Sequence, residues 1–162
     1  NSEVEMKEKK ERVEDALHAT QAAVAEGFVP GGGMALVNCV SCIDGVSFDN
    51  DDQKLGGNIV KKSIQEPFKK ILLNAGFENH YEILTKIETK KLEDKENDLW
   101  IGYNVKHDRY ENFKDSGVID PTKVTRTALD NAASIAGTTL TTESVVFLEE
   151  KKSENQFDSE EF

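Results

Sequence analysis

Three consecutive glycines, Gly31 to Gly33, form the segment of this sequence best suited to approach a ligand. Because glycine has no Cβ atom, this backbone can adopt positive φ angles and come close to a bound molecule. A helical pattern follows at once, and the free N–H groups at a helix N-terminus favour an anion such as phosphate. The glycines therefore indicate an anion site, although a plain connector between two helices would have the same sequence.

Two cysteines, Cys39 and Cys42, have the spacing of a redox pair or of half a zinc site. Both lie in the apolar run 34–43, where helical spacing places Cys39 on one apolar face with three aliphatic residues. The sequence has no second cysteine pair, and its three histidines do not have the spacing of metal ligands. Buried, unreactive thiols are the favoured interpretation, which predicts a reducing compartment and no metal bound by Cys or His.

The amino-acid composition argues against membranes and nucleic acids as partners. Of the 162 residues, 37% are hydrophobic and 31% are charged, as is typical of a globular protein of one ordinary domain. No apolar run reaches the ~20 residues that a membrane span needs, so no membrane partner is expected. The net charge of −11 argues against nucleic acid, because non-specific binding depends on Lys and Arg that neutralise phosphates.

Helical spacing of apolar residues predicts a mainly α-helical chain. Gly27 and Pro30 are expected to end the first helix. The last helix has a clear start signal, with Asp120 at the N-cap and Pro121 at the first helical position. The predicted helices cover residues 3–25, 33–43, 53–65, 67–75, 79–89 and 121–136.

Strand-like composition is confined to residues 99–103 and 138–148. The mixed-charge stretch 90–98 is predicted to be a mobile surface loop, and the charged tail 149–162 is predicted to be disordered. Two separated strands cannot form a stable sheet, and the final strand would have an open edge. Since the chain also starts inside a helix without a cap, we expect a missing partner, either another part of a longer chain or a neighbouring subunit.

Several stretches together resemble group I chaperonins, the GroEL type of bacteria, mitochondria and plastids. The resemblance extends over about residues 3–148, in the family's order. The matching segments are Val4 to Lys10, Arg12 to Thr20, Gly31 to Gly33, Asp120 to Arg126, Ala128 with Leu129, and Thr141 to Ser144.

The resemblance implies a piece of a subunit that has apical, intermediate and equatorial domains. Residues 1–26 resemble the last helix of the intermediate domain, and residues 27–148 resemble the C-terminal half of the equatorial domain. The implied fold is mainly α, a multihelical equatorial half with short β strands. The apical domain and the N-terminal equatorial half, with its phosphate loop and metal-binding aspartate, are not represented, so no metal ligand is expected in this chain.

The resemblance also implies roles for individual residues at a site for ATP with Mg. Asp15 matches the aspartate that swings onto the nucleotide and is needed for hydrolysis; a carboxylate can orient and polarise the attacking water. Gly32, beside Gly31, matches a backbone contact to the nucleotide. Asp120 matches a residue that binds the ribose, although it could also cap its own helix.

A second set of residues is implied beside the adenine. Tyr103 and Asn104 match this segment, and the two residues after them depart from the small residues that the family has there. Two apolar side chains are expected to contact the base. The full set is Ile71, Tyr103, Asn104, Val105, Lys106 and Val118.

The implied function is that of an ATP-driven machine that encloses and refolds non-native proteins. Its partners would be identical subunits in a seven-membered, double ring, and a co-chaperonin and unfolded proteins bound through the absent apical domain. The implied location is a mitochondrial matrix, a plastid stroma or a bacterial cytoplasm. The tail ends in Glu-Glu-Phe rather than in Gly-Gly-Met repeats, which leans toward a plastid type.

Two alternatives come from other classes. The isolated chain is expected to lack ATPase activity, so it could be a non-catalytic assembly module that only makes ring contacts. A thiol-redox protein based on Cys39 and Cys42 is the more distant alternative. Nucleotide binding distinguishes the first alternative, and alkylation of the native thiols distinguishes the second.

Overall fold

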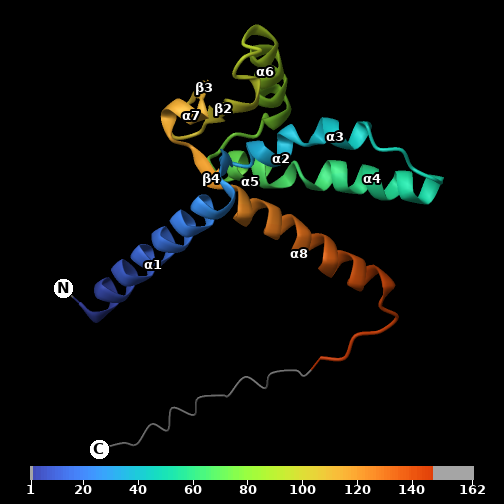
Figure 1. Ribbon diagram of the computed structural model, residues 1–162, viewed down its shortest axis with the longest axis horizontal. Helices are drawn as coiled ribbons and strands as arrows, with labels where there is room; N and C mark the ends of the chain where they lie inside the picture. The colour runs from blue at the N-terminus through green and yellow to red at the C-terminus, as the bar shows by residue number, and fades with distance from the viewer. Residues whose placement is uncertain (1, 148–162) are drawn as a thin grey trace, which may run out of the picture.

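Two long helices diverge from a small body in the computed structural model, which describes residues 2–147 (Figure 1). The first, α1 (Glu3–Glu26), begins with a capping box, in which the Ser2 hydroxyl accepts from the Glu5 N–H and the Glu5 carboxylate accepts from the Ser2 N–H. The expectation of an uncapped start is therefore wrong. Gly27 ends the helix with a φ of 78°, as predicted.

Short helices follow α1 along the chain and form the body, and the long helix α8 comes last. Most lie close to the predicted ranges, but the predicted helix 33–43 is broken at Cys39 into two pieces of five residues each. The elements are α2 (Met34–Asn38), α3 (Val40–Asp44), α4 (Asp51–Ser63), α5 (Glu66–Asn74), α6 (His80–Glu93), the 3₁₀ helix η1 (Asp98–Trp100), α7 (Phe113–Ser116) and α8 (Thr122–Thr141).

Four short strands form two antiparallel pairs in the part of the chain that the structure describes. Strand β1 (Phe28–Pro30) pairs with β4 (Ile119–Pro121), so that Val29 lies opposite Asp120. Strand β2 (Ile101–Asn104) pairs with β3 (Arg109–Asn112) as a hairpin. Only β2 was anticipated, because strands of three or four residues are too short to show an alternating pattern.

The core lies where α2, α5, α6, the hairpin and α7 meet. Its most deeply buried side chains come from four different helices, which explains why these short elements are stable together. They are Met34, Phe68, Leu72, Ile87 and Phe113.

The prediction of buried cysteines is wrong, because both Cys39 and Cys42 are exposed. The break between α2 and α3 changes the helical phase, so α2 buries Met34 and Val37 instead. The cysteines line an open, mostly apolar groove of about 490 Å³ between α2, α3 and the start of α8. Desolvation nevertheless raises the pKa of the Cys39 thiol, which disfavours the reactive thiolate.

The predicted terminal strand is also wrong over the described residues. Helix α8 passes through Gly137 and ends at Thr141, and residues 143–147 form no strand. The hydroxyls of Thr138 and Thr139 donate to the carbonyls four residues earlier, which satisfies these polar groups inside the helix. Leu148 and the predicted disordered tail 149–162 lie outside the described residues.

The charged stretch 90–98 is a loop only in its middle, residues 94–97, because α6 continues to Glu93 and η1 begins at Asp98. Ile83 and Ile87 fix α6 in the core. Within residues 2–147, no helix combines the length and the apolar character needed to cross a membrane.

Candidate functional site

The glycine turn 31–33 lies between β1 and α2, and its conformation needs glycine. Gly32 and Gly33 have φ angles of 63° and 81°. A Cβ atom on Gly33 would lie 2.8 Å from the backbone nitrogen of Phe68, so α5 packs directly against this residue. The N–H of Gly31 donates to the carbonyl of Val118 at 2.9 Å, which joins the turn to the segment before β4.

Asp120 lies next to this turn, because the β1–β4 pairing brings it opposite Val29. Burial raises the pKa of its half-buried carboxyl group, and the backbone N–H of Gly32 acts in the opposite direction. Helix α8 starts at Thr122 with Pro121 as its N-cap and without a side-chain capping bond. The prediction that Asp120 caps α8 is therefore wrong, and its carboxylate faces the glycine turn.

The β2–β3 hairpin holds Tyr103 and Asn104 at its end. Tyr103 is 7% exposed, its ring packs edge-on against Phe77 with centroids 5.4 Å apart, and its hydroxyl donates to Asp108. Burial, and then this carboxylate, raise the pKa of Tyr103 to about 12. The Tyr103 side chain is thus part of the core, which leaves the backbone of this segment for a ligand contact.

Asn104 organises the turn of the hairpin. Its Oδ1 accepts from the N–H of Lys106 at 3.0 Å, and its Nδ2 donates to Glu111 at 2.6 Å. Lys106 itself is exposed, whereas Val105 packs against the core. The two positions that depart from the family pattern thus have different environments.

Phe113 connects the glycine turn with the hairpin, and sequence reasoning missed it. It is 1% exposed, and a Cβ atom on Gly102 would lie 2.4 Å from its ring. The same ring is the nearest group to a Cβ atom on Gly32, at 3.7 Å. An aromatic residue in the polar segment 106–117 was the only sequence signal for this role.

The remaining predicted residues lie on two helices. Ile71 is 38% exposed on α5, three residues after Phe68, which contacts the glycine turn. Asp15 is exposed on α1, where the residues around it, Glu8, Glu11 and Arg12, belong to the same helix. Since α1 rises ~1.5 Å per residue, Asp15 lies roughly 16 Å along the helix from Glu26. The structure therefore gathers Gly31, Gly32, Val118 and Asp120 and leaves Asp15 apart.

An ion pair joins the end of α1 to α8. The guanidinium of Arg126 donates to both carboxylate oxygens of Glu26, at 2.7 and 3.1 Å, and also contacts Asp130. The hydrogen bond and the positive charge of Arg126 lower the pKa of Glu26. The carbonyl of Gly27, the next residue, accepts from the N–H of Thr122 at 3.1 Å, so the ion pair and this backbone bond together hold the end of α1 beside the start of α8.

Replacing Arg126 with Gln should loosen the last turn of α1. We expect amide hydrogen exchange of residues 22–27 to be roughly threefold faster, in keeping with an exposed ion pair. A lowered carboxyl pKa means that the contact is fully present above the ordinary glutamate range and is lost as the pH falls through the lowered value. The control is Arg109→Gln, which breaks the exposed pair with Glu111; equal exchange in both variants would contradict the prediction.

Among the described residues, no group of three or more His, Cys, Asp or Glu side chains is placed to hold a metal ion. Any ligand at the glycine turn would therefore meet backbone N–H groups, one half-buried carboxylate and apolar side chains.

Comparison with known proteins identifies similar chains. Residues 1–150 match the model of the TCP-1/cpn60 chaperonin family. The fold is similar to a crystal structure of a group III chaperonin in the open state, with a TM-score of 0.63 and 24% sequence identity. The similarity covers 77% of this chain and 25% of the other, so the chain spans about a quarter of the length of that protein.

Proposed function

The chain belongs to the TCP-1/cpn60 chaperonin family, and on this premise we propose that it supplies part of the ATP site and part of the ring contacts of a chaperonin subunit. The full protein would be an ATP-hydrolysing chaperone that encloses and refolds non-native proteins. The segment matched here would correspond to the end of the intermediate domain and the C-terminal half of the equatorial domain.

One observation carries the nucleotide part of the proposal: the carboxylate of Asp120 lies beside the backbone of Gly32. A carboxylate can accept hydrogen bonds from the two hydroxyls of a ribose, and a glycine turn without side chains allows a ligand to approach the backbone closely. The N–H of Gly31 already donates to the Val118 carbonyl, and helix α2 has only five residues, so the proposal rests on this close approach and not on a helix dipole. Val118 and Ile71 provide apolar surface suited to a base.

Replacing Asp120 with Asn should weaken nucleotide binding and, at pH 7, increase the stability of the nucleotide-free protein. We expect Mg-ADP to bind about tenfold more weakly, because a charged acceptor is lost. We also expect the nucleotide-free variant to unfold at a higher temperature at pH 7. A raised carboxyl pKa means that the folded protein loses stability as the pH rises from the ordinary aspartate range through the raised value, and Asn does not titrate.

The gain in stability of Asp120→Asn should therefore vanish in acid. Isothermal titration calorimetry measures binding, and thermal unfolding at several pH values measures stability. Asp115→Asn, at an exposed position on α7, serves as the control. Binding equal to that of the wild type would contradict the role of Asp120 at the nucleotide.

Asp15 would complete the catalytic site only after a movement of α1. The helix ends at a hinge glycine and is held by the Glu26–Arg126 pair, so a rotation at this point would displace Asp15 by many ångströms. Metal-bound nucleotide chemistry would depend on ligands supplied by the rest of the subunit.

A ring of subunits follows from the same premise. Chaperonins form oligomeric rings, and we propose the seven-membered, double ring of the group I type because the matching motifs are those of that type. Exposed apolar side chains on α8, including Val124, Leu129 and Ile135, are suited to contacts with other parts of such an assembly.

A non-catalytic assembly module remains the second candidate, because Asp15 lies apart from the glycine turn and Tyr103 is buried. One experiment separates the two candidates. The native mass of the longest natural polypeptide containing this sequence is measured by light scattering, with and without Mg-ATP, alongside Mg-ADP titration. A large ring that binds nucleotide supports the proposal, a ring without nucleotide binding supports the assembly module, and a monomer contradicts both.

A further inference from the structure

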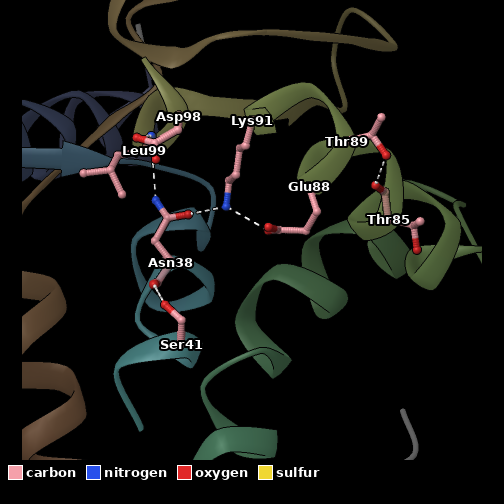
Figure 2. Close-up of polar contacts among 8 residues, drawn as sticks. All are labelled: Asn38, Ser41, Thr85, Glu88, Thr89, Lys91, Asp98 and Leu99. Atoms are coloured by element: carbon pink, nitrogen blue, oxygen red, sulfur yellow. Dashed lines mark hydrogen bonds and ion pairs between the residues drawn. The ribbon is translucent and has the colours of Figure 1, made fainter. Parts of the chain in front are cut away.

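A polar network joins α2 to α6 and η1, two neighbouring elements that lie more than 40 positions later in the sequence (Figure 2). The Nδ2 of Asn38, on α2, donates to the carbonyl of Leu99, in η1, at 2.8 Å. The Nζ of Lys91, on α6, donates to the Oδ1 of Asn38 at 2.8 Å and to a carboxylate oxygen of Glu88 at 2.9 Å. The Asn38 amide therefore accepts a hydrogen bond from Lys91 through its oxygen and donates one to the Leu99 carbonyl through its nitrogen.

The chemistry of the two side chains makes this arrangement directional. A lysine ammonium can only donate, so it must face the oxygen of the Asn38 amide. The amide NH₂ is then turned toward the Leu99 carbonyl, which can only accept. The Lys91 side chain is 13% exposed, so its aliphatic stem is packed and its ammonium is held near these partners, although the Glu88 side chain is 62% exposed.

The location of Asn38 gives the network a consequence for the proposed nucleotide site. Helix α2 follows the glycine turn directly and is anchored in the core by Met34 and Val37. Leu99 lies two residues before β2, which ends at Asn104. Asn38 thus ties the helix after the glycine turn to the strand that carries the predicted adenine segment.

We propose that Asn38 is a positioning residue that sets the glycine turn against β2, and that Lys91 acts through it by fixing the orientation of its amide. This inference rests on the proposed function, because the two segments matter together only if they share a nucleotide. Phe113 connects the same two segments by apolar packing, and Asn38 adds a directional restraint that packing cannot provide.

The test measures Mg-ADP affinity by calorimetry in the natural polypeptide that contains this sequence. Lys91→Met keeps the aliphatic stem and removes the donor, and we expect about fivefold weaker binding, within the range for residues that act through a packed network. Asn38→Leu should have a similar effect, and the double variant should bind no more weakly than Asn38→Leu alone, because Lys91 acts only through Asn38. Lys91→Arg retains a charged donor and should restore most of the affinity.

The control is Lys86→Met, the same substitution on the same helix, where the lost pair with Glu82 is exposed. Additive effects of the two single variants, or wild-type affinity of Lys91→Met, would overturn the proposal. If Asn38→Leu does not fold, the proposal is tested by comparing the Mg-ADP affinities of Lys91→Met and Lys91→Arg.

If the wild-type protein binds no nucleotide, the proposed function fails but the coupling is still tested. Amide hydrogen exchange of residues 34–39 and 97–104 should then be faster in Lys91→Met than in Lys86→Met. Unchanged exchange in both segments would overturn the coupling as well.

Discussion

Replacing Asp15 with Ala in the full-length protein should preserve ATP binding and remove most ATP hydrolysis. Asp15 is exposed on α1, which points away from the body that holds the glycine turn (Figure 1), so its carboxylate does not reach that turn in this arrangement. Its proposed role begins when α1 moves, because a carboxylate beside the terminal phosphate can orient and polarise water. A lost general base or water-orienting group typically slows the reaction by about 10²–10⁴-fold.

The measurement is steady-state ATPase activity together with the dissociation constant of Mg-ATP. Glu11→Ala is a matched control, because Glu11 is an exposed acid one turn earlier on the same face of α1. We expect that control to hydrolyse ATP at the wild-type rate. Unchanged turnover in Asp15→Ala would show that the matched motif does not have its expected catalytic role in this protein.

Replacing Gly33 with Ala should disrupt both folding and the nucleotide site. The residue has a φ of 81°, which costs an alanine about 1–2 kcal/mol. The added Cβ would also lie 2.8 Å from the backbone nitrogen of Phe68, and backbone cannot yield as a side chain can. Overpacking of this kind costs a further ~1–3 kcal/mol.

Gly76→Ala is the matched control for this effect. Gly76 has a φ of 86° and ends α5 with Phe77, whose N–H bonds back to the Leu72 carbonyl, but a Cβ there would meet no atom within 4 Å. We expect Gly76→Ala to lower the thermal midpoint modestly and Gly33→Ala to lower it severalfold more, with a large loss of soluble protein. Equal shifts would mean that the contact with α5 is more adaptable than the structure indicates.

Much of the chain could be predicted from local signals. Gly27 ends α1 as expected, and α5 ends within one residue of the predicted range 67–75, just before Gly76, because a left-handed or otherwise unusual backbone position favours glycine regardless of what packs nearby. The helical character of most segments followed from apolar spacing. The glycine turn and the other motifs also pointed to a chaperonin, the family that residues 1–150 match, whereas the group I type stays a prediction.

The candidate site was less predictable, because it depends on contacts between distant segments. Asp120 had the local signature of a helix cap, yet pairing with β1 places it in a strand beside Gly32. The Tyr103 side chain is packed in the core, which leaves only the backbone of the predicted adenine segment for a ligand. Neither outcome has a signal in the neighbouring residues, because strand pairs this short are formed only when the rest of the core brings them together.

Sequence by itself therefore determined the helical class, the ends of α1 and α5, the glycine turn and the chaperonin family, since each depends on backbone preference or on a linear motif. Only the tertiary structure decided which residues meet. It exposed Cys39, extended α6 to Glu93 so that Lys91 reaches Asn38, and brought Phe113 between the turn and the hairpin. The physical reason is that burial and hydrogen-bond partners are properties of pairs far apart in the chain, which no local pattern encodes.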